Sequence, residues 1–548
     1  MLFSFSTTGG IVLGFLCSVS CSNAVEVTTS KGIIVGSDHL RSRHGKVIYS
    51  FTGIPYAKPP VGKLRFKVAE PVEPWQEPLN ATGKCPSCAW VKRPSELGQL
   101  QIVGQEDCLR LNVYSPSLAA ETRLPVMLYI HGGSYRFFFT MAGPEFLENV
   151  VLVDITYRLG VLGFATTGDG IIPGNLGLKD QVLALQWVRD NIAHFGGDPD
   201  SVTVFGNSAG GASTHLLLLS PLAKGLLHRG ISMSGTAACP WAMIPRQLAI
   251  DRTKAFSILC GCPPEPSKEL LECLQEVPIR SIVEMLQKFR DEYYLPLTEF
   301  APIIEEESAH NAFLTRDPDE IESEIPWMTG INSADHLSYP YKEFLLHVQR
   351  NGLNMGEQLD IFLSKWLSYG FNVSKKGIPS VMSKIKTFYF GNESIADEHK
   401  LLKLDEVIAD GWFLKGLIHA VSKYRGNTYL YYYDYQQSNA TFFSIIGRGF
   451  SEERGASHMD ELLSLFPMTA FFPGRSLSET DVQVSEKMVT LWTHFATHGN
   501  LTMNNLTTWE PVEKNSSRYK YLYIGADELL QKDSLLSDRV EFWRSLHE

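Results

Sequence analysis

The sequence lacks long apolar runs and any strong excess of one charge. Beyond the first two dozen residues no apolar run approaches the length of about 20 residues that a membrane-spanning helix needs, and HLLLLSPLAKGLL is short and interrupted. The 49 Lys and Arg stand against 60 Asp and Glu, so the formal net charge is −11 over 548 residues. Such a modest, dispersed charge argues against nucleic-acid binding and favours a neutral or apolar small-molecule substrate.

Metal-binding clusters and glycine-rich phosphate loops are missing as well. No His, Cys or carboxylate spacing typical of a metal site is found, and no nucleotide-binding loop. The sequence therefore predicts no cofactor and no metal ion. It gives no signal for the oligomeric state.

The first residues are typical of a secretory leader. IVLGFLCSVSCSNA is a short apolar run that ends in small residues, although no Lys or Arg precedes it. We expect residues 1–24 to be a cleaved signal peptide, with an uncleaved anchor as the alternative, and residues 25–548 to form one domain. The C-terminus, EFWRSLHE, is neither a retention signal nor a lipid-exchange tail, which favours secretion.

Two residue types agree with a secretory route. Asn-x-Ser/Thr sequons, which are candidate glycosylation sites, begin at Asn80, Asn372, Asn392, Asn439, Asn500, Asn505 and Asn515. Beyond the leader seven cysteines remain: Cys85, Cys88, Cys108, Cys239, Cys260, Cys262 and Cys273. Because this number is odd, at least one thiol is expected to be free or to pair with another molecule.

Strand-like and helix-like segments alternate from Leu124 to about Gly235. LPVMLYIHGG and NVVLVDITY are β-rich apolar runs, the stretch from Leu178 to Ile192 has helical spacing and stops at Gly196, and SVTVFG is a further strand. Later, TYLYYYDY predicts a strand and VSEKMVTLWTHFATHGN an amphipathic helix. This order predicts an α/β fold with a large, mostly parallel sheet flanked by helices and interrupted by long insertions.

The segment from Gly206 to Gly210 reads GNSAG and matches the G-x-S-x-G pattern between a strand and a helix. A sharp strand-to-helix turn exposes the serine hydroxyl, and the flanking glycines let the two elements approach. Ser208 is therefore a candidate nucleophile. The alternative is a glycine-rich turn with a serine helix cap.

A second glycine loop, HGGSY, follows the strand LPVMLYI. Backbone N–H groups at the end of a strand can stabilise a developing oxyanion. We take Gly133, Ser134 and Ala209 as the candidate oxyanion donors, against the alternative of a simple tight turn.

A serine nucleophile of this kind requires an acid and then a histidine later in the chain. TGINSADHLSY places Asp335 after a strand-like segment, and ERGASHMDELL places His458 before a helix. The residues alone do not choose His458 over His194 or His419. Nor do they choose Asp335 over the run Glu305, Glu306 and Glu307.

Across essentially the whole chain beyond the leader, the sequence resembles the type-B carboxylesterase and cholinesterase family of α/β-hydrolases, insect-type esterases as much as any. The matching segments are GIPYAKPPVGKLRF, EDCLRLNVYSP, LPVMLYIHGGSY, the region around GNSAG, and ISMSGTAACPWA. The resemblance implies a catalytic triad of Ser208, Asp335 and His458. It also implies disulfides Cys88–Cys108 and Cys262–Cys273 and an ion pair between Arg65 and Glu106.

Four positions depart from the family pattern. Asn207 stands where a Glu, Gln or His usually precedes the nucleophile, Ser134 replaces the third glycine of the oxyanion loop, and His336 and Met459 replace glycines after the acid and the histidine. None of them removes a proton carrier, but Asn207 contributes no charge at the position before the serine that could hold a cation. With Gly98 where cholinesterases carry a Trp, choline esters are not expected.

Two functions follow from these residues. The first is a secreted serine esterase for small to medium apolar esters, with Phe137, Phe138 and Phe139 as candidate pocket residues or core packing. The second is a catalytically impaired, cholinesterase-like adhesion or binding protein, for which the four departures are the support. Stoichiometric phosphonylation of the purified protein would separate the two.

Overall fold

The computed structural model describes residues 24–92, 101–138, 143–291, 295–335, 339–391, 398–437, 442, 455–468, 476–503, 507–514, 516 and 518–546. Its largest element is a 13-stranded sheet with the order β1-β2-β3-β7-β9-β8-β10-β11-β12-β13-β16-β17, and β4 pairs with β2. The strands of this sheet are β1 Ala24–Thr29, β2 Gly32–Arg41, β3 Val47–Pro55, β4 Leu79–Asn80, β7 Arg110–Ser115, β8 Leu124–Ile130, β9 Val151–Ile155, β10 Gly197–Asn207, β11 Arg229–Met233, β12 Trp327–Asn332, β13 Thr428–Tyr433, β16 Tyr521–Ile524 and β17 Leu529–Lys532.

The sheet has an antiparallel half and a parallel half. Strands β1, β2, β3, β7 and β9 pair antiparallel, and the strands from β9 through β8, β10, β11, β12 and β13 to β16 pair parallel before the antiparallel edge strand β17. The central strands β9 and β12 are buried along their whole length, as expected for parallel strands covered on both faces. The predicted α/β class with a mostly parallel sheet is confirmed.

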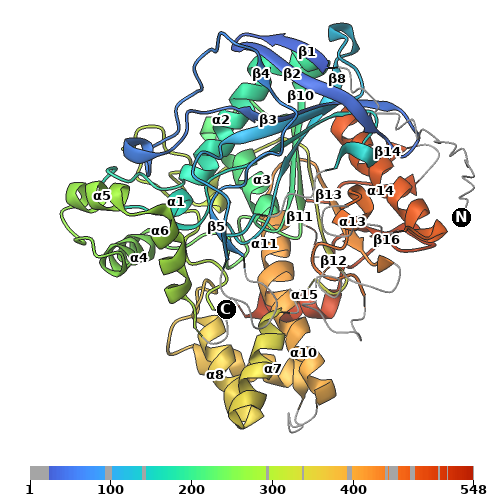
Figure 1. The fold of residues 1–548 in the computed structure, drawn as a ribbon. Helices are drawn as coiled ribbons and strands as arrows, with labels where there is room; N and C mark the ends of the chain where they lie inside the picture. Colours follow the sequence, from blue (N-terminus) through green and yellow to red (C-terminus); the bar gives the residue numbers. More distant parts are fainter. Residues whose placement is uncertain are drawn as a thin grey trace, which may run out of the picture.

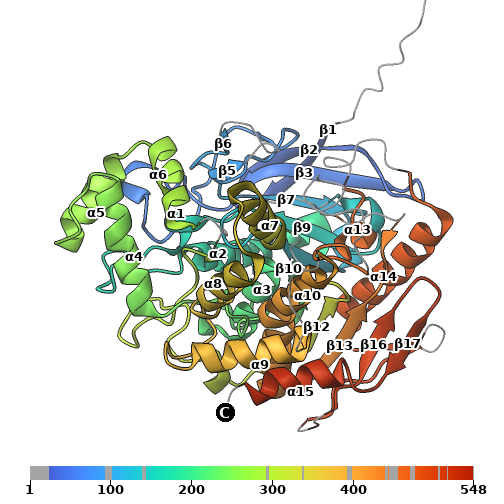
Figure 2. The same cartoon turned by 90° about the horizontal axis from the view of Figure 1, so that it is seen from below.

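Helices from different parts of the chain flank this sheet (Figures 1 and 2). Helices α4, α5 and α6 group at one side of the sheet, and α13 and α14 lie at the other. The helices are α1 Gly160–Phe164, α2 Leu176–Asn191, α3 Ala209–Leu219, α4 Arg246–Leu259, α5 Ser267–Glu276, α6 Ile279–Met285, α7 Tyr339–Asn351, α8 Met355–Leu367, α9 Ile378–Phe390, α10 Glu398–Ala409, α11 Lys415–Lys423, α13 Leu462–Leu465, α14 Glu479–His498 and α15 Ser537–Ser545. No described helix has both the length and the apolar character that crossing a bilayer would take.

Sequence signals explain the bounds of helices α2 and α14. Helix α2 passes into a short 3-10 turn and stops at Gly196, which has a φ of 78°. Helix α14 begins with a capping box between Ser478 and Asp481 and ends at Gly499 in the left-handed region. Both agree with the helices predicted from the sequence.

The chain reverses its direction of travel across the sheet between β8 and β10. From β8 it crosses to β9 on one side, and β10 then lies on the other side of β8. In open α/β sheets a crevice forms outside the carboxyl ends of the strands at such a reversal. The loop beginning at His131 follows β8 and Ser208 follows β10, so both sequence motifs lie at this point.

Candidate active site

Ser208 occupies a strained turn between β10 and α3. Its φ and ψ are 59° and −123°, a region that side chains seldom adopt, and the residue is 8% exposed. A Cβ atom at Gly206 or Gly210 would lie 2.4 Å or 2.0 Å from the carbonyl oxygen of Ile130. The two glycines of the motif are therefore required by the close approach of β8.

The loop after β8 has three consecutive residues with positive φ: Gly133 at 112°, Ser134 at 56° and Tyr135 at 55°. It passes directly beside the serine, because a Cβ atom at Gly132 would lie 3.1 Å from the Ser208 Cβ. Within the described residues, the N–H groups of Gly133 and Ser134 donate no hydrogen bond. Ala209 is the first residue of α3, where the helix supplies no acceptor for its N–H.

Asp335 and His458 are brought together by two loops that lie far apart in the sequence. Asp335 follows β12, and a parallel bridge joins Ala334 to Ser457. The Nδ1 atom of His458 lies 2.6 Å from Oδ1 of Asp335, with the side chains 1% and 2% exposed. The carboxylate also accepts a hydrogen bond of 3.2 Å from the backbone N–H of Asn332. The structure thus forms the acid–histidine contact that the resemblance implies.

The remaining nitrogen of His458 is available for chemistry. Nε2 is buried and hydrogen-bonds to no described atom. Because Nδ1 faces a carboxylate, Nδ1 carries the proton in the neutral ring and Nε2 is the acceptor. Phe413 stacks on the imidazole with ring centroids 4.6 Å apart and lies in a π-helical segment, Asp410–Leu414. Such segments often occur at functional sites.

A buried carboxylate that the sequence did not predict lies behind these residues. Asn207 donates through Nδ2 to Oε1 of Glu461 at 2.5 Å, and Asn332 donates to Oε2 of the same carboxylate. Asn332 also donates to the backbone oxygen of Ser457 at 2.6 Å. Asn207 itself carries no charge, but it binds a carboxylate supplied by another segment.

The surroundings of Glu461 favour its neutral form. Burial raises the pKa of this carboxyl to about 7, and the nearby charge of Asp335 adds to the increase. The hydrogen bond from Asn332 and the charge of His458 act in the opposite direction. Glu461 consequently changes charge near neutral pH, within the pH range in which a histidine also titrates.

Two of the four departures from the family pattern keep a backbone conformation that favours glycine. Ser134 has a φ of 56° and Met459 a φ of 77°, so each side chain carries strain that glycine would avoid. The substitutions have changed the side chains without changing the local turn. His336 lies outside the described residues.

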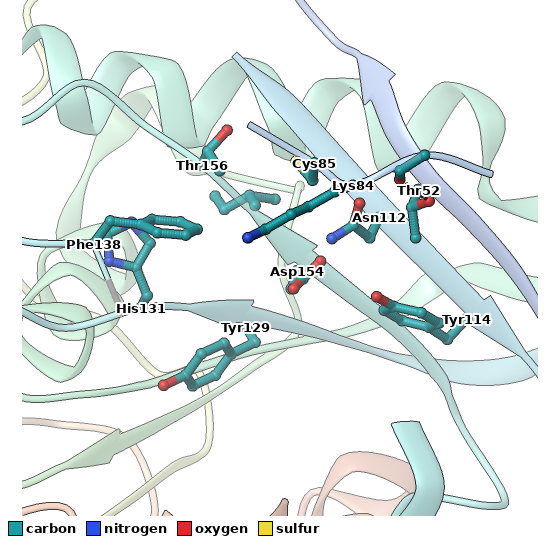
Figure 3. Close-up of a pocket in the computed structure, with 12 residues that line it drawn as sticks. Thr52, Lys84, Cys85, Asn112, Tyr114, Tyr129, His131, Phe138, Asp154 and Thr156 are labelled. Atoms are coloured by element: carbon teal, nitrogen blue, oxygen red, sulfur yellow. Dashed lines mark hydrogen bonds between the residues drawn. The ribbon is translucent and has the colours of Figure 1, made fainter. Parts of the chain in front are cut away.

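A cavity of about 200 Å³ adjoins the oxyanion loop (Figure 3). His131 and Phe138 close one end, Thr52 and Tyr114 lie toward the other, and Lys84 extends between them. Burial lowers the pKa of His131 to about 4, so its ring is neutral. Ser208 and His458 are not among the described residues that line this cavity.

The phenylalanines expected near a pocket have different positions. Phe138 lines the cavity beside the oxyanion loop, whereas Phe137 packs edge-on against Trp90 with ring centroids 6.0 Å apart. Phe139 lies outside the described residues. The apolar surface that reaches His458 comes instead from Phe413, against which Trp241 packs at 5.9 Å.

The covalent and ionic pairs implied by the resemblance are present. Cys88 is bonded to Cys108 and Cys262 to Cys273, and Arg65 contacts both carboxylate oxygens of Glu106, at 2.6 and 2.7 Å. The remaining described thiols, Cys85, Cys239 and Cys260, are free. No group of three or more metal-ligating side chains that could hold an ion is found in the part of the chain that the structure describes.

Three sequons lie on described, exposed residues: Asn80, Asn372 and Asn500. Asn80 is in the short edge strand β4, and its Oδ1 accepts a hydrogen bond of 2.7 Å from Thr82 within the same sequon. The four other candidates, Asn392, Asn439, Asn505 and Asn515, lie outside the described residues.

The sheet order, the turn that holds Ser208 and the histidine–carboxylate pair define the chain as an α/β-hydrolase. A solved structure of juvenile hormone esterase from Manduca sexta, with OTFP covalently attached, has a TM-score of 0.82 and 28% identity, and the match covers 96% of this chain and all of that one. The model of the carboxylesterase family matches residues 23–543. The chain therefore belongs to the carboxylesterase family, a family of carboxylic ester hydrolases.

Curated relatives agree along nearly their whole length. Esterase E4 of Myzus persicae is 36% identical over 520 residues, which is 92% of this chain and 92% of the relative. Juvenile hormone esterase of Tribolium castaneum is 33% identical, with 96% of this chain and 94% of the relative covered. The predicted family is confirmed.

Proposed function

We propose that the protein is a secreted serine carboxylic ester hydrolase that acts on small to medium apolar esters through an acyl-enzyme. The observation that carries the proposal is the contact between His458 Nδ1 and Asp335, which leaves Nε2 as a proton acceptor. Residues 25–548 are proposed to form the catalytic domain once residues 1–24 are removed.

In the proposed reaction the Ser208 oxygen attacks the ester carbonyl carbon as its proton passes to His458 Nε2. The tetrahedral oxyanion accepts hydrogen bonds from the N–H groups of Gly133, Ser134 and Ala209. His458 then gives its proton to the leaving alkoxide, and water attacks the acyl-enzyme by the same path in reverse. Asp335 holds the imidazole tautomer and stabilises the imidazolium.

Several observations support this assignment. The loop that carries Gly133 and Ser134 passes beside Ser208 at Gly132, where an added Cβ atom would lie 3.1 Å from the Ser208 Cβ, and Ala209 directly follows Ser208. The aromatic side chains of Phe413 and Trp241 give the surface beside His458 an apolar character. The related Manduca sexta structure, with OTFP covalently attached, supports a nucleophile in this fold.

The test compares wild type with Ser208→Ala, using Ser537→Ala as a control that removes an exposed serine hydroxyl. Hydrolysis of a short-chain p-nitrophenyl ester and covalent labelling by an organophosphate are expected in wild type and in the control. Both are expected to disappear in Ser208→Ala, as when a serine nucleophile is removed. Equal turnover and labelling of wild type and Ser208→Ala would reject Ser208 as the nucleophile, and absence of both reactions in wild type would favour the catalytically impaired binding protein.

Secretion is supported by the apolar leader and by two disulfides, which persist in oxidising compartments. Mass spectrometry of protein collected from the culture medium is expected to show an N-terminus at Val25. Glycans are expected at the exposed residues Asn80, Asn372 and Asn500. Intracellular retention with an intact leader would contradict this part of the proposal.

A further inference from the structure

Each of the three proposed triad residues lies within three positions along the chain of a member of one buried cluster. Asn207 directly precedes Ser208, Asn332 lies three residues before Asp335, and Glu461 lies three residues after His458. We define Asn207, Asn332 and Glu461 as the amide–carboxylate cluster. They are at most 2% exposed, and Glu461 accepts hydrogen bonds from both amides.

We propose that Glu461 is a positioning residue whose negative charge stabilises the His458 imidazolium, and that Asn207 adapts to either protonation state of Glu461. This inference rests on the proposed esterase function. It concerns a residue that touches neither the ester nor the oxyanion.

The hydrogen-bond pattern fits the ionised form of Glu461, which prevails above the pKa of about 7 that burial gives this carboxyl. Both oxygens accept from amide N–H groups, and no cation contacts them among the described residues. Buried carboxylates are usually balanced by a paired charge. Here the balancing charge would arise only on His458, when it takes the proton of Ser208.

Asn207 and Asn332 differ in their freedom to turn. Asn332 also donates to the backbone oxygen of Ser457, so its amide is fixed as a donor. The Oδ1 atom of Asn207 is buried and has no hydrogen-bond partner among the described residues. If Glu461 takes a proton, a rotation of the Asn207 amide brings Oδ1 into position to accept it.

The other titratable groups around Glu461 do not supply the missing positive charge. His458 and Asp335 face it from the catalytic pair, Asp460 from its own segment, and three tyrosines from β8 and β13: Tyr129, Tyr431 and Tyr433. Burial raises the pKa of each tyrosine and of Asp460, so these groups favour their neutral forms. Among these groups only His458 becomes a cation, and it does so in the proposed reaction.

The experiment measures kcat/KM of wild type and Glu461→Gln from pH 5 to pH 8, with rates normalised to sites titrated by an organophosphate. The amide introduced by this substitution imitates the protonated carboxyl, because its oxygen accepts from Asn332 and its N–H group donates to Oδ1 of a rotated Asn207. The rate ratio of wild type to variant is expected to rise from near one at about pH 5, where Glu461 is protonated in wild type, to about tenfold at about pH 8, where its charge faces the imidazolium. Glu479→Gln, which removes an exposed carboxylate, is expected to give a ratio of one throughout.

A second variant moves the charge within the cluster. In the double variant Asn207→Asp and Glu461→Gln the carboxylate and the amide exchange places, so the hydrogen bond is reversed and the charge is kept. It is expected to recover most of the wild-type rate at about pH 8. This variant also decides the matter if Glu461→Gln yields no titratable sites.

The possible outcomes separate the two proposals. A ratio that does not change with pH, or a double variant that stays as slow as the single one, overturns the inference while leaving the esterase intact. Wild type that neither hydrolyses the ester nor reacts with the organophosphate removes the proposed function itself.

Discussion

Buried carboxylates are balanced in two different ways in this molecule. In the framework, Asp180 is 0% exposed and accepts two side-chain hydrogen bonds from Arg158, at 2.6 and 2.8 Å, and Glu305 contacts Lys179 at 2.6 Å. In the candidate site, Asp335 contacts a histidine and Glu461 contacts two amides. These framework carboxylates have permanent cationic partners, and the site carboxylates do not.

The difference indicates what each region is organised to do. A complete buried ion pair holds elements together but has no charge left to respond to a reaction. A carboxylate held by neutral donors is costly in the resting protein, yet it is already oriented toward a cation that forms during catalysis. Asp335 and Glu461 are of this second kind, and four predictions test the contrast.

The largest effect is expected from neutralising the site carboxylate that contacts the histidine. Asp335→Asn should lower kcat/KM by about 10³ to 10⁴, because the amide no longer fixes the tautomer of His458 or stabilises its charge. Steady-state hydrolysis of a p-nitrophenyl ester measures the loss, and thermal melting verifies folding. A decrease below about tenfold would contradict the proposed role of Asp335.

Breaking a framework pair should instead reduce stability. Asp180→Asn leaves Arg158 buried without its carboxylate, and the expected loss is about 3 to 5 kcal/mol in the free energy of unfolding. Urea denaturation provides the measurement. Asp190→Asn is the control: its partner Arg189 is 52% exposed, and the expected change is below about 0.5 kcal/mol. Equal losses in the two variants would remove the distinction.

The cost of the uncompensated site carboxylate should be visible in the pH dependence of stability. The pKa of Glu461 is raised in the folded protein to about 7, against about 4.3 in an unfolded chain. The folded state therefore holds the proton more tightly, and this contribution to stability is lost as the pH rises through about 7.

Relative to Glu461→Gln, wild type should lose about 3 kcal/mol between about pH 4.5 and pH 8. Urea unfolding of both proteins across this range tests the sign. A constant difference between them, or a wild type that gains stability with pH, would show that Glu461 is not held neutral by burial.

The smallest effect is expected at the oxyanion loop, where backbone rather than charge contributes. Ser134→Gly should keep kcat/KM within about threefold, because the donor is the N–H group of residue 134 whatever its side chain. Thermal stability should change by no more than about 1 kcal/mol, as relief of strain at a φ of 56° is offset by a more flexible unfolded chain. A larger loss of activity would mean that the hydroxyl itself participates.

Local patterns in the sequence were sufficient for the central elements. Strands β8 and β10, helix α2 and helix α14 follow from periodicity and from glycine stops, and the turn at Ser208 follows from a five-residue motif. The antiparallel strands β1, β2 and β3 were not predicted, because their apolar and polar residues do not separate clearly without the pairing that buries one face.

The amide–carboxylate cluster shows where sequence reasoning ended. Asn207, Asn332 and Glu461 come from three segments, and an Asn or Glu alone carries no sign of a buried partner. The sequence shows how close these residues are along the chain to Ser208, Asp335 and His458. Only the structure shows that the segments meet, through the bridge between Ala334 and Ser457. Phe413 was missed for a similar reason, since a π-helical turn shifts its position along the helix surface.

The long separation between Asp335 and His458 has a consequence for protein synthesis. The two residues are 123 positions apart, and the Ser208 turn and the oxyanion loop are made well before either of them. A growing chain therefore contains its candidate nucleophile and oxyanion donors before the proton acceptor has been translated. Reactivity toward an organophosphate should therefore appear in a single step late in synthesis, after β12, β13 and His458 have been translated.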